Sequence, residues 1–206
     1  MANLKVDICG VEFKNPVIAA SGTYGFGREF EEIYDISCIG GVSTKGTTLE
    51  PRLGNPVPRI AEGSSVILNA VGLQNPGVEH FIKDDLPFLK DKGVVIIANV
   101  AGNTLEDYQL ICRRLNGLVD MVELNISCPN VHAGGMALGI KPQNIREVTS
   151  LTKAELTKTP LIVKLSPNVE SIPDNARAAE EGGADCISLV NTFTGMVIDL
   201  ERRKPI

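Results

Sequence analysis

The sequence predicts an α/β protein in which helices cover a mostly parallel β-sheet. Short apolar segments rich in Val and Ile recur along the 206 residues, and each is followed by a turn and then by a helical pattern. Segments this apolar are typical of strands buried on both faces, and parallel strands require crossover connections that are usually helical. Six such strand–helix units follow one another. This alternation fits both a doubly wound sheet and a (β/α)8 barrel.

The six strands are predicted from their β-branched, apolar content and from the turn residues that flank them. They cover residues 17–20, 38–43, 94–98, 121–124, 161–164 and 186–190. Ahead of them, residues 4–13 alternate around Gly10 and predict an N-terminal hairpin. Neither a G-x-G-x-x-G fingerprint nor a Walker A motif is found, so no dinucleotide or P-loop site is indicated.

Two of the predicted helices carry signals at their ends. Asn103, with Glu106 three residues later, predicts a capping box at the start of a helix with an apolar stripe. Gly182 and Gly183 predict the end of a later helix. The predicted helices cover residues 29–34, 78–89, a segment from about 103, a segment from about 142, and 173–181, and a long connection spans residues 45–76.

Composition and charge exclude several classes of protein. The net charge of −5 and the pI of about 5.1 indicate no basic surface for nucleic acid or anionic lipid. No apolar run is long enough to span a bilayer, and the first residues do not resemble a leader, so we expect a cytoplasmic protein without a membrane partner. Five cysteines without a C-x-x-C pair argue against a disulfide framework or a metal site. All but Cys128 are predicted to be small core residues: Cys9, Cys38, Cys112 and Cys186.

Polar residues follow all six predicted strands, and in a barrel such positions meet at one mouth. An asparagine side chain both donates and accepts hydrogen bonds, which suits an amide-rich heterocycle, and a lysine suits a carboxylate or a reduced flavin. The site is therefore predicted to bind an anionic, imide-bearing ligand, a flavin, or both. The residues concerned are Ser21, Thr44, Lys45, Asn99, Asn125, Ser127, Cys128, Lys164, Asn191 and Thr192.

Several segments resemble motifs of the dihydroorotate dehydrogenases. They are the G-x-x-F-x-N-P stretch ending at Pro16, S-T-K-G at residues 43–46, N-A-V-G-L-Q-N-P-G at 69–77, N-I-S-C-P-N at 125–130, V-K-L-S-P at 163–167 and V-N-T at 190–192. Together they cover the whole chain, and two of them are long and specific. The resemblance implies a (β/α)8 TIM barrel that oxidises dihydroorotate to orotate on FMN, in the synthesis of UMP.

The resemblance also implies a role for individual residues. Cys128 would be the catalytic base, taking a proton from C5 of dihydroorotate while a hydride leaves C6 for the flavin. A free thiol has a pKa of about 8.5, so this base would need a lowered pKa or a mildly alkaline medium. The implied substrate-binding residues are Lys45, Asn69, Ala70, Val71, Gly72, Leu73, Asn125, Asn191 and Thr192. The implied FMN-binding residues are Ser21, Lys45, Gly46, Asn99, Asn125, Lys164 and Val190.

The loop after the base indicates which branch of the family the chain resembles. G-G-M-A-L-G at residues 134–139 resembles the members that pass electrons to NAD through a subunit carrying FAD and an iron–sulfur cluster. The resemblance then implies a homodimeric core of a heterotetramer, and the glycines of this loop make it a candidate lid. The chain resembles the soluble members of the family in two respects: it has Cys128 where the membrane-docking members carry Ser, and it shows no N-terminal extension.

Two alternatives remain open from the sequence. A dihydropyrimidine dehydrogenase has a similar flavin domain but acts on uracil or thymine, which lack the carboxylate. The chain contains six of the eight units of a full barrel, so we expect residues 1–206 to be a single FMN-binding domain that is incomplete at its C-terminus. The turns that usually hold the FMN phosphate would belong to the missing units, and a catalytically inactive barrel fragment is the second alternative.

Overall fold

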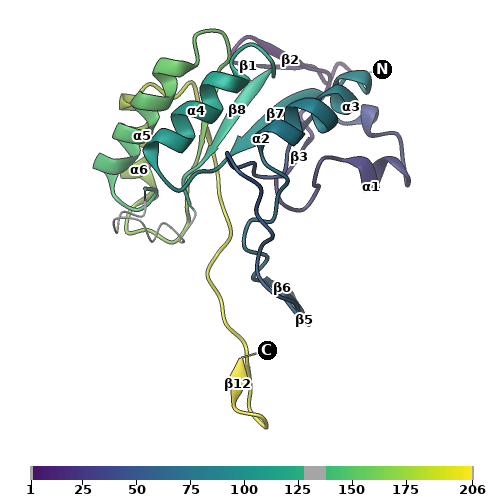
Figure 1. Ribbon diagram of the computed structural model, residues 1–206, viewed down its shortest axis with the longest axis vertical. Coiled ribbons are helices and arrows are strands. Elements are labelled where there is room, and N and C mark those ends of the chain that lie inside the picture. Colours follow the sequence, from purple (N-terminus) through teal and green to yellow (C-terminus); the bar gives the residue numbers. More distant parts are fainter. Residues whose placement is uncertain (1, 128–137, 206) are drawn as a thin grey trace.

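The computed structural model describes residues 2–127 and 138–205, and its centre is a six-stranded parallel sheet (Figure 1). The strands lie in the order β10-β9-β8-β7-β4-β3, so each predicted unit adds its strand beside that of the preceding unit. A doubly wound sheet reverses its strand order at a switch point, whereas a barrel does not. The bounds are β3 Ile18–Ala19, β4 Gly41–Ser43, β7 Val95–Val100, β8 Met121–Asn125, β9 Leu161–Lys164 and β10 Cys186–Ser188.

The sheet is strongly curled, which confirms the barrel prediction in the form of a half-barrel. Ser21 follows β3 at one edge, and Lys164 ends β9, four strands away. Neighbouring strands lie about 4.8 Å apart, so a flat sheet would separate these two residues by roughly 19 Å. Instead, Nζ of Lys164 donates a hydrogen bond to Oγ of Ser21 at 3.2 Å. The carboxyl ends of the strands therefore face one another across a concave surface.

Helices cover the convex face of the sheet, with α4, α5 and α6 packed side by side (Figure 1). Their apolar stripes, together with alternate strand residues such as Val122, Leu124 and Val163, form the main buried core. Among the described residues no helix is long and apolar enough to cross a membrane. The helical segments are α1 Arg28–Glu31, a 3-10 turn at Ile36–Cys38, α2 Val78–His80, a π-helical turn at Phe81–Asp85, α3 Leu86–Asp91, α4 Leu105–Leu115, α5 Pro142–Glu155 and α6 Ile172–Glu181.

The capping box of α4 is present, but it begins one residue later than predicted. Thr104 is the N-cap, and its side chain accepts a hydrogen bond from the backbone N–H of Asp107 at 3.1 Å. The carboxylate of Asp107 in turn accepts from the backbone of Thr104. Threonine in extended conformation is a good N-cap and aspartate can replace glutamate at the third helical position, so this pair outcompetes Asn103 and Glu106.

The concave face changes from apolar to polar along each central strand. Asn99 lies opposite Glu123, and Asn125 lies opposite Lys164, in the register of β7, β8 and β9. Residues two apart share a face of a strand, so the same face carries apolar residues at the amino ends. These apolar residues, Ile97, Met121 and Ile162, form a second cluster with Phe13.

The predicted N-terminal hairpin closes the apolar end of this concave face. It consists of β1 Val6–Ile8 and β2 Val11–Phe13. Phe13 is fully buried, and its ring lies directly beneath Gly41, where an added Cβ would come within 2.8 Å of the ring. The hairpin therefore seals one end of the half-barrel with hydrocarbon, and the polar end remains for a ligand.

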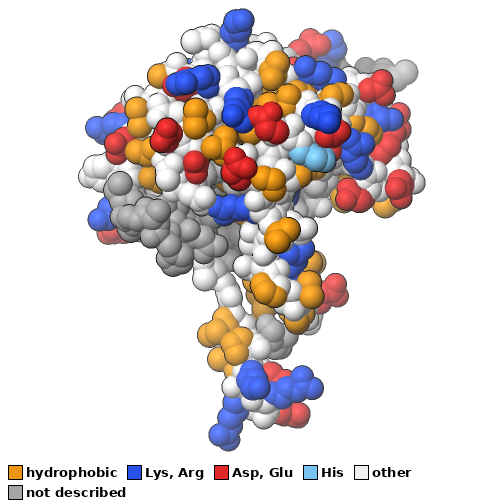
Figure 2. All heavy atoms as spheres, in the orientation of Figure 1, with side chains coloured by type: hydrophobic (Ala, Val, Ile, Leu, Met, Phe, Trp, Pro, Cys, Tyr) orange, Lys and Arg blue, Asp and Glu red, His pale blue; other side chains and the backbone are white. Residues whose placement is uncertain are grey.

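Two hairpins that the sequence analysis did not predict extend away from the body (Figure 1). β5 Ile60–Gly63 and β6 Val66–Asn69 lie within the long connection, and β11 Ile198–Asp199 pairs with β12 Lys204–Pro205. Figure 2 shows hydrophobic side chains along these projections. In these two hairpins, the side chains of Ile60, Ile67 and Leu200 are more than half exposed.

The prediction that four cysteines are core residues is wrong for two of them. Cys9 occupies the turn of the N-terminal hairpin with φ 54°, and its side chain is exposed. Cys38 is also exposed, because Asp35 accepts a hydrogen bond from Ser37 N–H at 2.9 Å and turns residues 36–38 into a 3-10 helix rather than the start of β4. Cys112 is buried and Cys186 half-buried.

Candidate active site

Three asparagines at the carboxyl ends of the strands are joined by their side chains. Nδ2 of Asn191 donates to Oδ1 of Asn125 at 2.9 Å, and Nδ2 of Asn125 reaches Oδ1 of Asn99 at 3.4 Å. Their sequence separations of 66 and 26 residues show that the fold, rather than local sequence, brings them together. The hydroxyl of Tyr108 on α4 fixes the backbone of Asn125 by donating to its carbonyl at 2.8 Å. The predicted convergence of amide groups is therefore present.

Lys164 lies beside this row of amides, on the floor of the concave surface. Its ammonium donates to Ser21 and lies 3.8 Å from Oε1 of Glu123. Glu123 is 5% exposed and accepts hydrogen bonds from Ser43 Oγ at 2.7 Å and from Asn99 Nδ2 at 2.5 Å. Neither Glu123 nor Ser43 was predicted as a site residue. The available signal was a charged residue inside the apolar segment M-V-E-L, which alternation places on the same face as Asn125.

Lys45 is the second cation of the site, and its surroundings differ from those of Lys164. No carboxylate among the described residues lies within ion-pair distance of its ammonium. Burial lowers the pKa of Lys45 from its ordinary value, and the positive charge of Arg59 lowers this pKa further. A partly buried ammonium without a carboxylate favours an anionic ligand, because the ligand would supply the missing counter-charge.

Gly46 allows the backbone to lie very close to the amide row. A Cβ at this position would come within 2.9 Å of both Asn99 Oδ1 and Leu73 Cδ1. Contacts this short do not occur for real Cβ atoms, so a larger residue would displace the amide or the leucine. The predicted site residues Lys45, Gly46, Leu73 and Asn99 therefore share one compact region.

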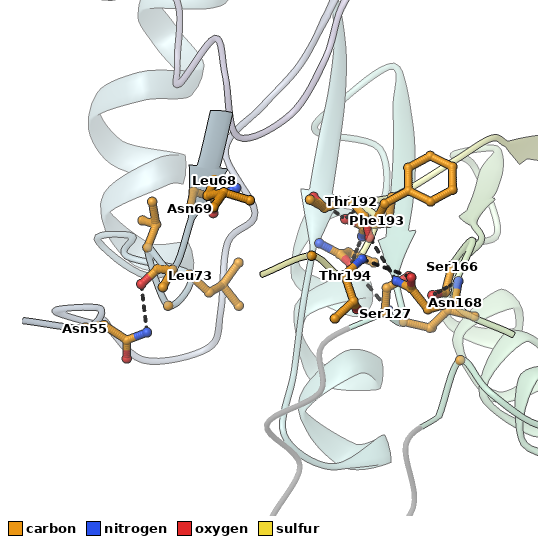
Figure 3. Close-up of a pocket in the computed structure, with 18 of the residues that line it drawn as sticks. Asn55, Leu68, Asn69, Leu73, Ser127, Ser166, Asn168, Thr192, Phe193 and Thr194 are labelled. Atoms are coloured by element: carbon orange, nitrogen blue, oxygen red, sulfur yellow. Dashed lines mark hydrogen bonds between the residues drawn. The ribbon is translucent and has the colours of Figure 1, made fainter. Parts of the chain in front are cut away.

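A pocket of about 670 Å³ opens beside the amide row (Figure 3). In the close-up, Asn55, Leu68, Asn69 and Leu73 lie on one side, and Ser127, Ser166, Asn168 and Thr192 lie on the other. Of the predicted substrate-binding residues, all except Lys45 line this pocket: Asn69, Ala70, Val71, Gly72, Leu73, Asn125, Asn191 and Thr192. Of the predicted FMN-binding residues only Asn125 lines it, whereas Ser21, Gly46, Asn99 and Lys164 belong to the adjoining polar region.

Several residues of the pocket were not predicted from the sequence. Asn168 donates to the carbonyl of Thr192 at 2.9 Å and accepts from the N–H of Thr194 at 3.0 Å. This two-point contact fixes the segment that carries Thr192. Ser127, which the sequence analysis did predict at the end of its strand, also lines the pocket. Its Oγ is buried and has no hydrogen-bond partner among the described residues, so a bound ligand could satisfy it.

Two predicted site residues have little or no described environment. Cys128 follows Ser127 in the sequence but lies outside the described residues, as does most of the candidate lid, of which only Leu138 and Gly139 are described. Val190 is half-buried and directly precedes Asn191. The assignment of Cys128 as the base therefore stays a prediction.

The fold and the pocket define a (β/α)-barrel protein whose strand ends form a polar ligand site. The family model for dihydroorotate dehydrogenase matches residues 3–206, and the chain belongs to this family. It is 55% identical over 205 residues to a protein of Alkaliphilus metalliredigens and 53% identical over 204 residues to one of Caldicellulosiruptor bescii. Both are named dihydroorotate dehydrogenase B (NAD(+)), catalytic subunit, and each match covers 99% of this chain and 68% of the relative.

Proposed function

We propose that this chain oxidises dihydroorotate to orotate in pyrimidine biosynthesis, with FMN as its cofactor. The observation that carries the proposal is the row of three asparagines beside a pocket of about 670 Å³. Two lysines accompany it: Lys164 faces Glu123, whereas Lys45 has no ion-pair partner in the part of the chain that the structure describes. Dihydroorotate is a cyclic imide with a carboxylate, so it offers several amide edges and one negative charge. The site offers the complementary groups, and the family's name agrees with this assignment.

The polar floor of the site fits the flavin ring of FMN. A flavin presents carbonyl oxygens and an imide N–H along one edge, and the side chains of Asn99, Asn125, Ser21 and Lys164 supply donors and acceptors for such an edge. Gly46 and Val190 would contribute backbone surface. When bound, FMN would supply the hydride acceptor. Lys164 would place positive charge where the reduced ring becomes negative.

The pocket then positions the substrate over this floor. Lys45 would pair with the carboxylate, and Asn69, Asn125 and Asn191 would bind the amide edges. Thr192, held by Asn168, would complete the site, with residues 70–73 as the opposite wall. Cys128 would remove the proton at C5 as C6 gives up its hydride. The residues of the chain therefore bind, orient and deprotonate the substrate.

A flavin-reduction assay tests this function. Protein saturated with FMN should lose its visible flavin absorbance when dihydroorotate is added without oxygen, and orotate should form in equal amount. Uracil with a reductant serves as the comparison. Turnover of uracil but not of dihydroorotate would instead identify a dihydropyrimidine dehydrogenase, and failure to bind FMN at all would contradict the proposal.

We further propose that the electrons pass to NAD through a second subunit carrying FAD and an iron–sulfur cluster, with a homodimer of this chain at the core of a heterotetramer. The resemblance of residues 134–139 supports this, and the relatives are named as catalytic subunits of NAD-linked enzymes. NAD reduction by dihydroorotate should require both subunits. Fumarate reduction by this chain alone, at a rate comparable with flavin reduction, would count against it.

A further inference from the structure

Glu123 is a buried carboxylate that the proposed reaction does not use. One of its oxygens, Oε1, accepts hydrogen bonds from Ser43 and Asn99 and also faces the ammonium of Lys164. A carboxylate that is 5% exposed is costly to bury unless it is paired and hydrogen-bonded. All three partners come from different strands, β4, β7 and β9, so Glu123 on β8 ties the floor of the site together.

Two of the three partners of Glu123 are residues that we assign to the flavin. Asn99 is fully buried and also contacts Asn125, and the side chain of Lys164 is 11% exposed and also donates to Ser21. A shift of the carboxylate would therefore move an amide and a cation of the flavin site at the same time. Lys45, in contrast, is not paired with any carboxylate of the described residues.

We infer that Glu123 is a positioning residue of the flavin site, which holds Asn99 and Lys164 in place and offsets the charge of Lys164. The inference rests on the proposed role of FMN. The two lysines then have separate roles. The charge of Lys164 is partly neutralised by Glu123, whereas the charge of Lys45 is available to pair with the substrate. Glu123 would thereby set how strongly the site favours the negatively charged, reduced flavin.

The negative charge of Glu123 predicts in which direction its removal shifts the stability of the reduced flavin. In a Glu123→Gln variant, the amide oxygen can still accept hydrogen bonds from Ser43 and Asn99, so the floor keeps its shape. The charge of Lys164 is no longer offset, so the site becomes more positive and the reduced flavin is stabilised. A Lys164→Met variant leaves the carboxylate and removes the cation, so it shifts the flavin in the opposite direction.

The midpoint potential of bound FMN and its affinity for sulfite, an anion that adds to oxidised flavin, measure this effect without turnover. We expect sulfite to bind about tenfold more tightly to Glu123→Gln, and the potential to rise by about 30 mV, the two-electron equivalent of a tenfold change. Lys164→Met should move both quantities the other way. Ser43→Ala keeps both charges and should give a smaller shift. A Glu123→Gln potential equal to that of the wild type, or shifted like that of Lys164→Met, would overturn the inference.

A double-mutant cycle in flavin-free protein separates this inference from the proposed function. Urea unfolding is measured for the wild type, Glu123→Gln, Lys164→Met and the double variant. If Glu123 holds Lys164, the double variant loses less stability than the two single variants added together. Strict additivity would overturn the inference even in a protein that bound no FMN, whereas absence of FMN from the wild type would overturn the proposed function alone.

Discussion

Replacing Cys128 by serine is expected to slow flavin reduction by dihydroorotate roughly 10²- to 10⁴-fold at neutral pH, the range typical of a lost general base. A serine hydroxyl is a far weaker base than a thiolate, so the variant should recover part of its rate at alkaline pH. Stopped-flow measurement of flavin bleaching across a pH series would give both results. Orotate should bind the variant normally, because only the proton transfer is affected.

Two other cysteines help to interpret this substitution, and one of them provides a matched control. Cys112 is fully buried in α4, and burial raises the pKa of its thiol to about 12, so it carries no thiolate at neutral pH. Cys186 begins β10, at the end of the strand away from the polar site. Cys186→Ser should therefore reduce flavin at the wild-type rate. A Cys128→Ser variant that is equally fast at neutral pH would show that another group is the base.

Replacing Lys45 by methionine is expected to weaken orotate binding roughly 10- to 150-fold, because a hydrogen bond to a charged group contributes about 1.5–3 kcal/mol. The ligand-free protein should respond in the opposite direction. Burial and the charge of Arg59 lower the pKa of Lys45 below its ordinary 10.5, so holding its proton costs stability at neutral pH. Lys45→Met should therefore unfold at a higher urea concentration than the wild type.

The stability difference between Lys45→Met and the wild type should depend on pH in a defined direction. A lysine whose pKa is lowered in the folded state destabilises the fold while it is charged, and stability recovers as the pH rises from its folded pKa toward 10.5. The advantage of Lys45→Met should therefore shrink in alkaline urea titrations. Lys164→Met is the control: it leaves Glu123 without its cation, so it should lose stability. A Lys45→Met protein that binds orotate like the wild type would contradict the assignment of Lys45 to the carboxylate.

The strand ends could be predicted from the sequence because two simple regularities coincide there. Apolar segments identify parallel strands, and the carboxyl ends of such strands meet at one mouth, so Lys45, Asn99, Asn125 and Lys164 could be brought together without any coordinates. Their mutual hydrogen bonds could not, because those depend on the curl of the sheet. The sequence could not decide between a doubly wound sheet and a barrel for a similar reason, because local sequence determines the strands, whereas strand order is a property of the whole fold.

Other features were missed because tertiary contacts, rather than local patterns, decide them. Glu123 is a single charged residue in an apolar strand, and only the tertiary contacts show that its carboxylate meets Asn99 and Lys164. The hairpin of β5 and β6 lies in a segment that is mostly exposed, so it carries no strong apolar alternation. Cys9 was predicted to be a core residue because it lies within an apolar strand pattern, but it occupies the turn of the hairpin and is exposed.

The sequential strand order has a consequence for how the molecule assembles during translation. Within the parallel sheet, each strand after β3 joins the edge left by the preceding strand of that sheet, so the sheet can grow as the chain leaves the ribosome. Some contacts, however, must wait for residues made much later. The hydrogen bond from Lys164 to Ser21 joins residues 143 apart, and that from Cys9 to the carbonyl of Asp185 joins residues 176 apart. The polar floor and the hydrocarbon seal at the two ends of the half-barrel are therefore completed late, when residues made first meet partners made near the end of synthesis.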